Sequence, residues 1–275
     1  MKRIELFEFE DFPWFPEVIR TSMTNLIVVF HKMMGTSEVV SNLILDLQKK
    51  HDFNQITDLG SGSGGPMLDV IQQVNSNRKG EKVKLVLTDL HPNPQMIKKI
   101  NNLNLENVKY HDQSINATNI DKAPSGLKTM IASFHHMNPM VAKKILNSAQ
   151  ANREPILIFE LAKNNIPTLA WWLFLPISLI ILVLMSAVMT LFVRPLTLKQ
   201  ILFTYFIPII PLTYAWDGQA SLMRTYTFDD VKNLIGETGK EDYHWEIDDA
   251  KKANGKKLGY YIIGYPKNDL LEKLK

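Results

Sequence analysis

The sequence predicts an α/β protein whose sheet is mostly parallel and ends in an antiparallel hairpin. Three observations support this fold class. Between residues 55 and 161, β-type runs alternate with helical runs, which is the pattern of βαβ units. A glycine-rich turn follows the first of these runs, at residues 60–65. Two β-type runs, 243–247 and 258–265, flank a polar turn and indicate a hairpin.

The strands expected in the alternating region lie near residues 55–59, 83–89, 107–111, 127–133 and 155–161, and the helices between them near 66–77, 94–102 and 139–150. Two further helical patterns precede them, at about Glu17–Met34 and Glu38–Lys50. In a parallel sheet, ligands bind at the carboxyl ends of the strands. Candidate functional residues are therefore expected at those ends.

Composition divides the chain into four segments. They are an N-terminal helical segment 1–50, an α/β core 51–165, a hydrophobic insertion 166–216 and a second core segment 217–275. The net charge of +3 over 275 residues includes no basic patch, so nucleic acid is not an expected partner. The absence of cysteine excludes disulfides and thiolate metal sites.

The glycine-rich turn predicts a nucleotide-type cofactor site. Gly60, Gly62 and Gly64 let the backbone adopt positive φ and approach a ligand closely, at the N-terminus of the next helix. Gly60, Gly62 and Gly65 also satisfy G-x-G-x-x-G, so a dinucleotide such as NAD is the alternative. Asp58 favours a different ligand, because a carboxylate there would repel a pyrophosphate and attract an ammonium or sulfonium.

This stretch resembles motif I of the class I S-adenosylmethionine (SAM)-dependent methyltransferases, in which an acidic residue leads G-x-G-x-G. The resemblance implies a Rossmann-like seven-stranded sheet, a helical lid formed by residues 1–50, and SAM as the cofactor. Asp89 resembles the family's ribose-binding acid, although an NAD enzyme would use the same position. Asn116 stands near the place where the family often has an acid that faces the adenine amino group. The cofactor-binding residues implied in this way are Asp58, Gly60, Ser61, Gly62, Gly64, Asp89, Leu90, Ile115, Asn116 and Phe134.

Two histidines follow the fourth expected strand, at a position that resembles motif IV of the same family. His135 or His136 could act as a general base, because a pKa near 6.5 suits proton removal at neutral pH. A structural role in packing or in shaping the cofactor pocket is the alternative. No metal site is expected, because adjacent residues in extended chain point to opposite sides and catalytic zinc usually has three protein ligands.

The segment after the fifth expected strand predicts association with a membrane. Ile166–Val193 contains no charged residue and as a helix would extend about 42 Å, more than the roughly 30 Å hydrocarbon core. Ile201–Trp216 is also uncharged but contains Pro208 and Pro211. Because the last strands must rejoin the sheet, an odd number of crossings is excluded. We expect a hairpin or re-entrant element embedded from the cytoplasmic side, with a double crossing or a buried helix pair as alternatives.

Two charged residues follow the hydrophobic insertion. Asp217 and Arg224 are candidate substrate-binding or catalytic residues, and a salt bridge or cap that anchors the hairpin is the alternative. The combined prediction is a membrane-associated SAM-dependent methyltransferase with a transmembrane or embedded helix. Its acceptor is expected to be small and lipophilic, of the quinone, isoprenoid or fatty-acid type. The alternatives are an NAD(P)-dependent oxidoreductase and a non-catalytic SAM-binding membrane module.

Overall fold

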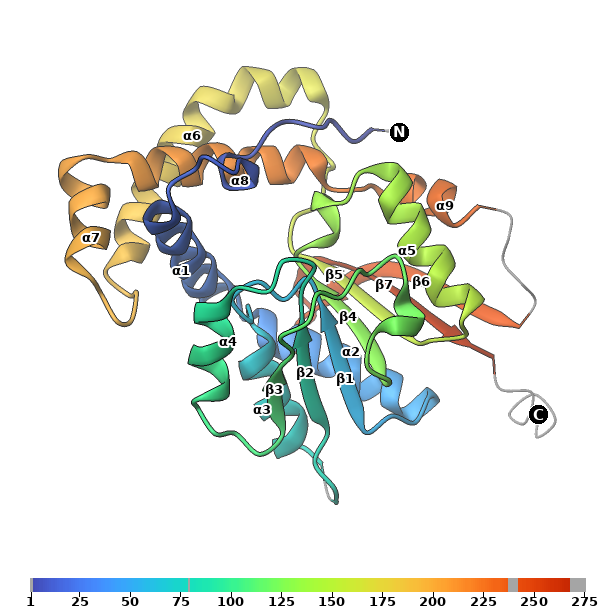
Figure 1. Cartoon of the computed structure of the whole chain (residues 1–275). Helices are drawn as coiled ribbons and strands as arrows, with labels where there is room; N and C mark the ends of the chain where they lie inside the picture. Colours follow the sequence, from blue (N-terminus) through green and yellow to red (C-terminus); the bar gives the residue numbers. More distant parts are fainter. Residues whose placement is uncertain (1, 79, 237–241, 268–275) are drawn as a thin grey trace. The chain divides into compact units, whose positions relative to one another are not determined.

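The computed structural model describes residues 2–78, 80–236 and 242–267 (Figure 1). Contacts divide the chain into two compact units. The helical unit combines Met1–Met34 with Ala162–Thr227, and the sheet unit combines Gly35–Leu161 with Phe228–Lys275. The ranges 1–50 and 217–275 anticipated from composition each contribute to both units.

The sheet unit contains the predicted seven-stranded sheet, in the order β3-β2-β1-β4-β5-β7-β6. Strands β1 to β5 pair in parallel, whereas β7 is antiparallel to both β5 and β6. The predicted fold class is thereby confirmed. The strands are β1 Gln55–Leu59, β2 Lys84–Thr88, β3 Val108–Tyr110, β4 Leu127–Ile131, β5 Ile156–Glu160, β6 Tyr243–Lys251 and β7 Lys257–Pro266.

Helices cover this sheet, and two of them begin with the same device. The Asn93 side chain accepts from two first-turn amides of α4, and the Asn138 side chain accepts from one first-turn amide of α5. Each of these helices opens with proline, and cap and proline together fix where it starts. β5 is buried throughout, as expected for a central strand covered on both faces. The helical segments of the unit are α2 Thr36–Lys50, α3 Met67–Ser76, α4 Pro94–Asn101, η2 Ile120–Lys122, η3 Phe134–His136, α5 Pro139–Ala151 and α9 Phe228–Ile235.

Two glycines let β7 fit against its neighbours. Gly264 lies opposite Trp245 in β6, and a Cβ at position 264 would come within 2.5 Å of the indole ring. At Gly259, where φ is +69°, a Cβ would lie 2.1 Å from the carbonyl oxygen of Glu160. β7 therefore lies so close to the end of β5 that only glycine fits at position 259.

The helical unit is built around α1, α6 and α8. Its buried cluster includes Leu26 from α1, Met189 from α6 and Ile210 from α8, so these three helices share one core. α6 contains no charged residue. Its internal proline, Pro176, lies one turn beyond Trp172. The elements are η1 Phe9–Asp11, α1 Glu17–Met34, α6 Thr168–Thr190, α7 Leu198–Ile201, the π-helical η4 Leu202–Phe206 and α8 Ile209–Arg224.

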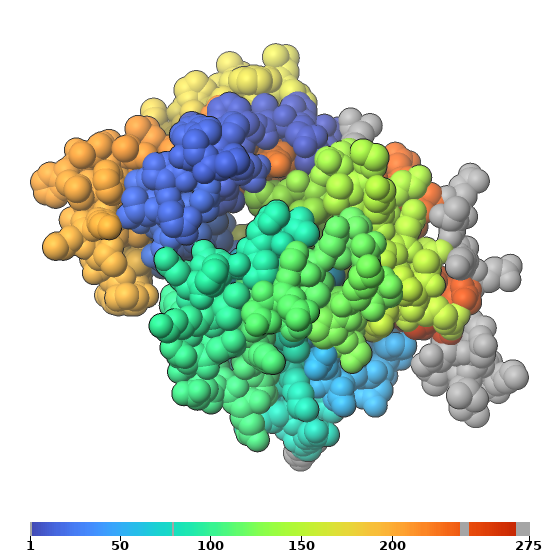
Figure 2. All heavy atoms as spheres, viewed as in Figure 1, coloured from blue at the N-terminus to red at the C-terminus, as the bar shows by residue number. Residues whose placement is uncertain are grey.

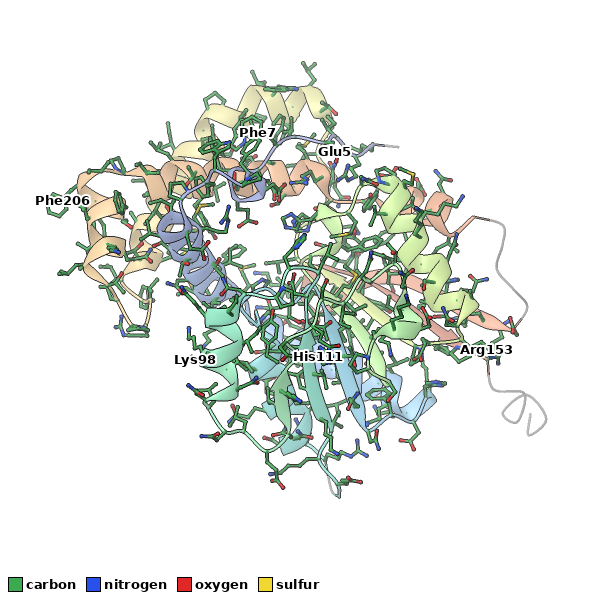
Figure 3. The ribbon with its side chains drawn as sticks, in the orientation of Figure 1. Glu5, Phe7, Lys98, His111, Arg153 and Phe206 are labelled. Atoms are coloured by element: carbon green, nitrogen blue, oxygen red, sulfur yellow. The ribbon has the colours of Figure 1, made fainter. Side chains whose placement is uncertain are left out.

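Among the described residues, one helix is long and apolar enough to cross a bilayer. This helix is α6, with 23 residues; Leu198–Phe206 and Ile209–Arg224 satisfy the same criterion together but are bent by 78°. Leu173 and Phe206 are 71% and 75% exposed, and Phe206 points outward (Figure 3). Figure 2 shows the α7–η4 region, in orange, on the surface of this unit. The other exposed apolar side chains of α6, η4 and α8 include Leu169, Trp172, Phe174, Ile177, Ile180, Ile181, Leu184, Val188, Leu202, Tyr205, Ile209 and Leu212.

Candidate functional site

The glycine-rich turn leaves β1 and enters α3 in a conformation that requires glycine. Gly60, Gly62, Gly64 and Gly65 have φ of +69°, +51°, +91° and +44°, so an L side chain at any of them would be strained. A Cβ on Gly64 would lie 3.2 Å from an Ile100 methyl group, whereas a Cβ on Gly62 would meet no atom within 4 Å. The turn therefore packs against the protein at Gly64 and is open on the side of Gly62.

Asp58 lies at the carboxyl end of β1, and both of its carboxylate oxygens are used within the protein. Oδ2 accepts a hydrogen bond from the Ser61 hydroxyl at 2.6 Å, and Oδ1 accepts one from the Thr129 hydroxyl at 2.6 Å. Ser61 Oγ also accepts from the Thr88 amide at 3.1 Å. This buried network ties the turn to β1, β2 and β4. A direct contact between Asp58 and a ligand ammonium stays a prediction.

The environment of Asp58 shifts its protonation. The pKa of the carboxyl is raised to about 7. Burial is the largest cause, the hydrogen bonds from Ser61 and Thr129 lower the pKa in part, and the neighbouring charge of Asp89 raises it. At neutral pH the group is therefore divided between its neutral and charged forms. A cation bound beside the turn would favour the charged form.

Asp89 follows β2 and reaches across to the glycine turn. Its Oδ2 accepts from the Gly62 amide at 2.9 Å, and its Oδ1 accepts from the His91 amide at 2.8 Å. The hydroxyl of Tyr110, the last residue of β3, donates to the Gly62 carbonyl at 2.9 Å. Gly62 is thus held through both its amide and its carbonyl group. Burial raises the pKa of the Tyr110 phenol, so this donor stays protonated.

The sequence did not single out Tyr110 as a site residue. A tyrosine at the end of a short strand was the available signal. It indicates a hydrogen bond from the hydroxyl, because buried tyrosine hydroxyls usually have a partner. What the sequence could not supply was that partner, because Gly62 lies 48 residues away along the chain.

The loop after β3 lies against the end of β2. The Ile115 amide donates to the Asp89 carbonyl at 2.9 Å, and Ser114 Oγ donates to the Leu90 carbonyl at 2.6 Å. Asn116 uses its side-chain oxygen locally, accepting from the Thr118 amide and hydroxyl at 2.9 and 2.8 Å. The structure therefore brings Asp89, Leu90 and Ile115 together. The Asn116 side-chain oxygen already accepts hydrogen bonds within its own turn, so a hydrogen bond from an adenine amino group would compete with those bonds.

Strained backbone marks the end of β4. Ala132 has φ of +53°, a left-handed conformation that is costly for a residue with a Cβ, and its amide donates to the Phe159 carbonyl at 2.7 Å. Ser133 follows, and its Oγ lies 3.7 Å from the position of a Cβ on Gly60. Within the described part of the chain, this buried Oγ has no hydrogen-bond partner. Phe134, expected at the cofactor, is fully buried.

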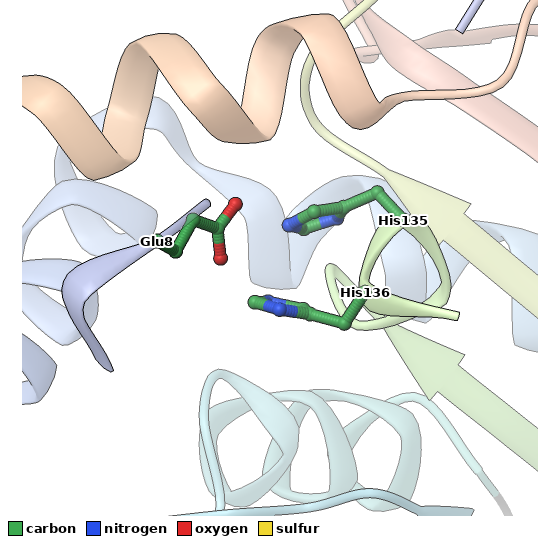
Figure 4. Close-up of side chains that lie close together, drawn as sticks. All are labelled: Glu8, His135 and His136. Carbon is green, nitrogen blue, oxygen red and sulfur yellow. The ribbon is translucent and has the colours of Figure 1, made fainter. Parts of the chain in front are cut away.

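His135 and His136 complete the carboxyl edge, in the one-turn helix η3. Their rings lie against each other, with centroids 4.3 Å apart (Figure 4). The carboxylate of Glu160, the last residue of β5, contacts His135 twice: Oε1 accepts from the His135 amide at 3.0 Å, and Oε2 lies 2.8 Å from Nδ1. The sequence pattern did not single out Glu160, although an acid that ends an otherwise apolar strand was a usable signal. Glu8, also labelled in Figure 4, is a residue of the helical unit.

Asp217 and Arg224 belong to the helical unit, where each binds the N-terminal segment. The Asp217 carboxylate accepts from the amides of Phe9 and Glu10 at 2.8 and 3.2 Å. The Arg224 guanidinium donates to Asp11 at 2.6 Å. Both side chains therefore hold residues 9–11 against α8. A role in substrate binding stays a prediction.

The sheet order, the antiparallel last strands and the glycine turn after β1 together define the class I SAM-dependent methyltransferase fold. A structure of the plantazolicin methyltransferase BpumL in complex with SAH is similar to this chain, with 12% identity, a TM-score of 0.54 and coverage of 91% of this chain and 89% of that one. A second BpumL structure, with a monoazolic desmethylPZN analog and SAH, has 14% identity, a TM-score of 0.53 and coverage of 90% and 89%. The chain matches no protein-family model and no curated protein sequence.

Proposed function

We propose that this protein is a SAM-dependent methyltransferase. The observation that carries the proposal is the arrangement around Gly62, whose amide is held by the Asp89 carboxylate at 2.9 Å in a turn that is open on that side. A carboxylate at the end of β2 is placed to accept hydrogen bonds from two ribose hydroxyls. It is joined at the same sheet edge by His135, a candidate base.

The residues present fit SAM as a bound group. Glycines leave the main chain uncovered at Gly62, and the buried Ser133 Oγ beside Gly60 still has hydrogen-bonding capacity. Asp58 and Asp89 make the turn negative, which suits a sulfonium and an ammonium and disfavours a pyrophosphate. SAM itself supplies an electrophilic methyl group. The chain supplies alignment of the acceptor with that methyl group, the main requirement when the leaving group is already good.

The proposed acceptor is small and lipophilic, of the quinone, isoprenoid or fatty-acid type. Support comes from the helical unit, where the apolar side chains of α6 and η4 face outward over several turns. Exposed apolar patches of this extent are typical of surfaces that bind lipid or another protein. An enzyme that sits on a bilayer meets acceptors that partition into it.

We propose further that α6 and the bent segment from α7 to α8 embed the protein in a membrane from its cytoplasmic side. The length of α6, 23 residues, is sufficient for the hydrocarbon core. The bend of 78° favours a re-entrant path for the second segment over a straight crossing. Co-flotation of the purified protein with liposomes tests this part, and recovery of all the protein in the lipid-free fraction would contradict it.

Binding of radiolabelled SAM, compared with NADH fluorescence under the same conditions, tests the cofactor assignment. We expect saturable SAM binding that Asp89→Asn weakens at least about tenfold, because one charge-assisted acceptor of the ribose is lost. The exposed acid Asp121, replaced by Asn, serves as the matched control and should leave SAM binding unchanged. Saturable NADH binding without SAM binding would favour the oxidoreductase alternative.

Methyl transfer to lipid extract separates an enzyme from a SAM-binding module. Labelled methyl groups should appear in the organic phase with wild-type protein, together with SAH in the aqueous phase. SAM binding without SAH production from any membrane extract would favour the non-catalytic alternative.

A further inference from the structure

We propose that the helical unit lies on one leaflet of a bilayer, with α6 parallel to the membrane plane and with Arg194 and Lys199 beside the phosphates of anionic lipids in that leaflet. This inference rests on the membrane embedding proposed above. It names the occupant of the apolar surface, an anionic lipid leaflet, and the orientation that α6 takes in it.

One face of α6 is apolar and exposed along the whole length of the helix. Its side chains recur every three or four residues, which is the spacing of one side of a helix. The opposite side is packed within the helical unit by residues that include Trp171, Leu175, Ser186 and Met189. A single apolar face that continues from end to end is what a helix lying in the membrane plane presents to lipid. The exposed face of α6 comprises Leu169, Leu173, Ile177, Ile180, Leu184, Val188 and the C-cap residue Leu191, each at least 56% exposed.

The segment from α7 to η4 is polar on its inner side and apolar on its outer side. Gln200 and Thr204, four residues apart, are buried, and the Thr204 hydroxyl lies 3.4 Å from that of Thr190 in α6. On the outer side, Leu198 and Phe206 are exposed (Figure 3). A helix that faces water has the reverse pattern. Polar side chains between helices and apolar ones on the outside are typical of helices that are surrounded by lipid.

The contacts of α8 argue against an orientation in which α6 crosses the bilayer. A Cβ on Gly218 would lie 3.6 Å from a methyl group of Leu182, and the indole N–H of Trp171 donates to Gln219 at 2.8 Å. Leu182 and Trp171 stand on either side of Pro176, so this turn of α8 packs against the central part of α6. If α6 crossed a bilayer, the turn would lie at the depth of the hydrocarbon core.

Charged groups are attached to this part of α8. The Asp217 carboxylate accepts from the Glu10 amide at 3.2 Å, and the Arg224 guanidinium donates to Asp11 at 2.6 Å. A crossing α6 would draw these groups and the partly exposed side chains of Glu10 and Asp11 toward the middle of the bilayer, where charges are costly. With α6 in the membrane plane, the same groups stay at the depth of the headgroups and water.

The charge of the hydrophobic insertion and its flanks favours an anionic surface. Residues 162–216 contain three cationic side chains and no acidic one. Arg194 and Lys199 flank the turn between α6 and α7, both are exposed, and among the described residues neither has an acidic partner. One nitrogen of Arg194 donates to the carbonyls of Leu191 and Val193 at 2.9 and 2.8 Å, which leaves its other N–H groups for a phosphate.

The same two cations keep both ends of α6 on one side of the membrane. Short loops rich in lysine and arginine stay on the cytoplasmic side and are not translocated. The cytoplasmic leaflet is also the one that carries anionic lipids and attracts cations close to its surface. A turn that stays on this side and an anionic lipid partner are therefore compatible, and both require that α6 does not cross.

The first test measures the depth of the exposed face of α6 in vesicles. The chain has no cysteine, so a single cysteine that replaces Leu169, Ile180 or Leu191 carries a fluorescent label at a known place. Quenching by lipids with nitroxides at two depths reports how deep each label lies. We expect the three labels to lie within about 5 Å of one another in depth, near the boundary between headgroups and acyl chains.

Two results would overturn this orientation. A label at position 180 that lies about 16 Å deeper than the labels at 169 and 191 would mean that α6 crosses the bilayer, since eleven residues of helix separate it from either. A label at position 191 that lies deepest of the three would mean a re-entrant path.

The second test varies the charge of the vesicles. Arg194→Ala combined with Lys199→Ala should weaken binding to phosphatidylcholine vesicles that contain about 30 mol% phosphatidylglycerol by about 25-fold, or about fivefold per cation. The same variant should bind phosphatidylcholine alone almost as wild type does. Arg194→Lys with Lys199→Arg keeps both charges and should restore most of the lost affinity. Lys82→Ala with Lys84→Ala removes two exposed cations of the sheet unit, serves as the matched control and should behave as wild type.

The outcomes separate this inference from the proposals above. Absence of binding to vesicles of every composition would overturn the embedding and this inference with it, whereas saturable SAM binding would still support the methyltransferase proposal. Unequal label depths with intact vesicle binding would overturn the membrane-plane orientation alone. Unchanged binding in the alanine pair would overturn the role of the two cations. An equal loss on neutral and anionic vesicles would also do so, because a general defect of the helical unit predicts that result.

Discussion

Protonation of Asp58 should make SAM affinity depend on pH. Burial raises the pKa of this carboxyl to about 7 in the free protein. A cation bound beside the turn stabilises the charged carboxylate and lowers that pKa, so binding favours loss of a proton. Affinity for SAM should therefore rise with pH until Asp58 is fully ionised in the free protein.

The magnitude follows from the pKa. At pH 6, one unit below it, about ten protonated molecules accompany each ionised one, so the apparent Kd is roughly tenfold higher than its limit at higher pH. This ratio corresponds to about 1.4 kcal/mol. Isothermal titration calorimetry at pH 6.0, 6.5, 7.0 and 7.5 covers the transition and stays below the range where the α-amino group of SAM loses its proton.

Asp58→Asn supplies the control. The amide is neutral at every pH, can still accept from one of the two hydroxyls of Ser61 and Thr129, and should give a weak affinity with little pH dependence. Buffers with different ionisation enthalpies should show that SAM binding releases up to one proton from wild type and none from the variant. A wild-type affinity that is flat across this pH range, or the same slope in Asp58→Asn, would refute this role of Asp58.

Three further substitutions test other parts of the structure. Gly259→Ala should destabilise the sheet unit by several kcal/mol, measured by urea unfolding, because its Cβ would overlap the main chain of β5; unchanged stability would contradict the close approach. Tyr110→Phe should cost about 1 kcal/mol in the same assay and weaken SAM binding, since Gly62 loses its hydroxyl donor; equal SAM affinity would show that this bond does not shape the turn. Leu173→Asp should weaken liposome binding by about 3 kcal/mol, whereas the same change at exposed Leu103 in the sheet unit should have little effect; equal effects at both would argue against α6 as the membrane contact.

Local patterns were sufficient to predict the sheet. β5 is apolar along almost its whole length and β1 ends in a turn with four glycines, so their type and limits follow from burial and backbone sterics alone. The expected strands near 83–89 and 107–111 are somewhat shorter in the structure, as β2 and β3. Strand ends are where local pattern carries least information, because pairing with the neighbour decides where a strand stops.

Site residues could be predicted only where the residue type and its position after a strand were enough to suggest a role. Asp89 and the glycines were predicted in this way, and in the structure the Asp89 carboxylate accepts a hydrogen bond from the Gly62 amide. The partner of His135 was not, because Glu160 is 25 residues away and reaches it only through the pairing of β4 with β5. Asp217 and Arg224 were expected to be substrate-binding or catalytic residues, or to anchor the hydrophobic insertion that they follow. In the structure α8 continues to Arg224 and keeps both residues in the helical unit, a boundary set by tertiary packing.

The position of β7 between β5 and β6 has a consequence for biosynthesis. β5 ends at Glu160 and β7 begins at Lys257, so roughly a hundred residues are translated between the two halves of this pair, about 5 to 20 s at ordinary ribosomal speed. Throughout that interval β5 presents an unpaired apolar edge of the nascent sheet. The hydrophobic helix α6 leaves the ribosome during the same time. Chaperone capture, or early delivery of α6 to lipid, would protect the chain during this window.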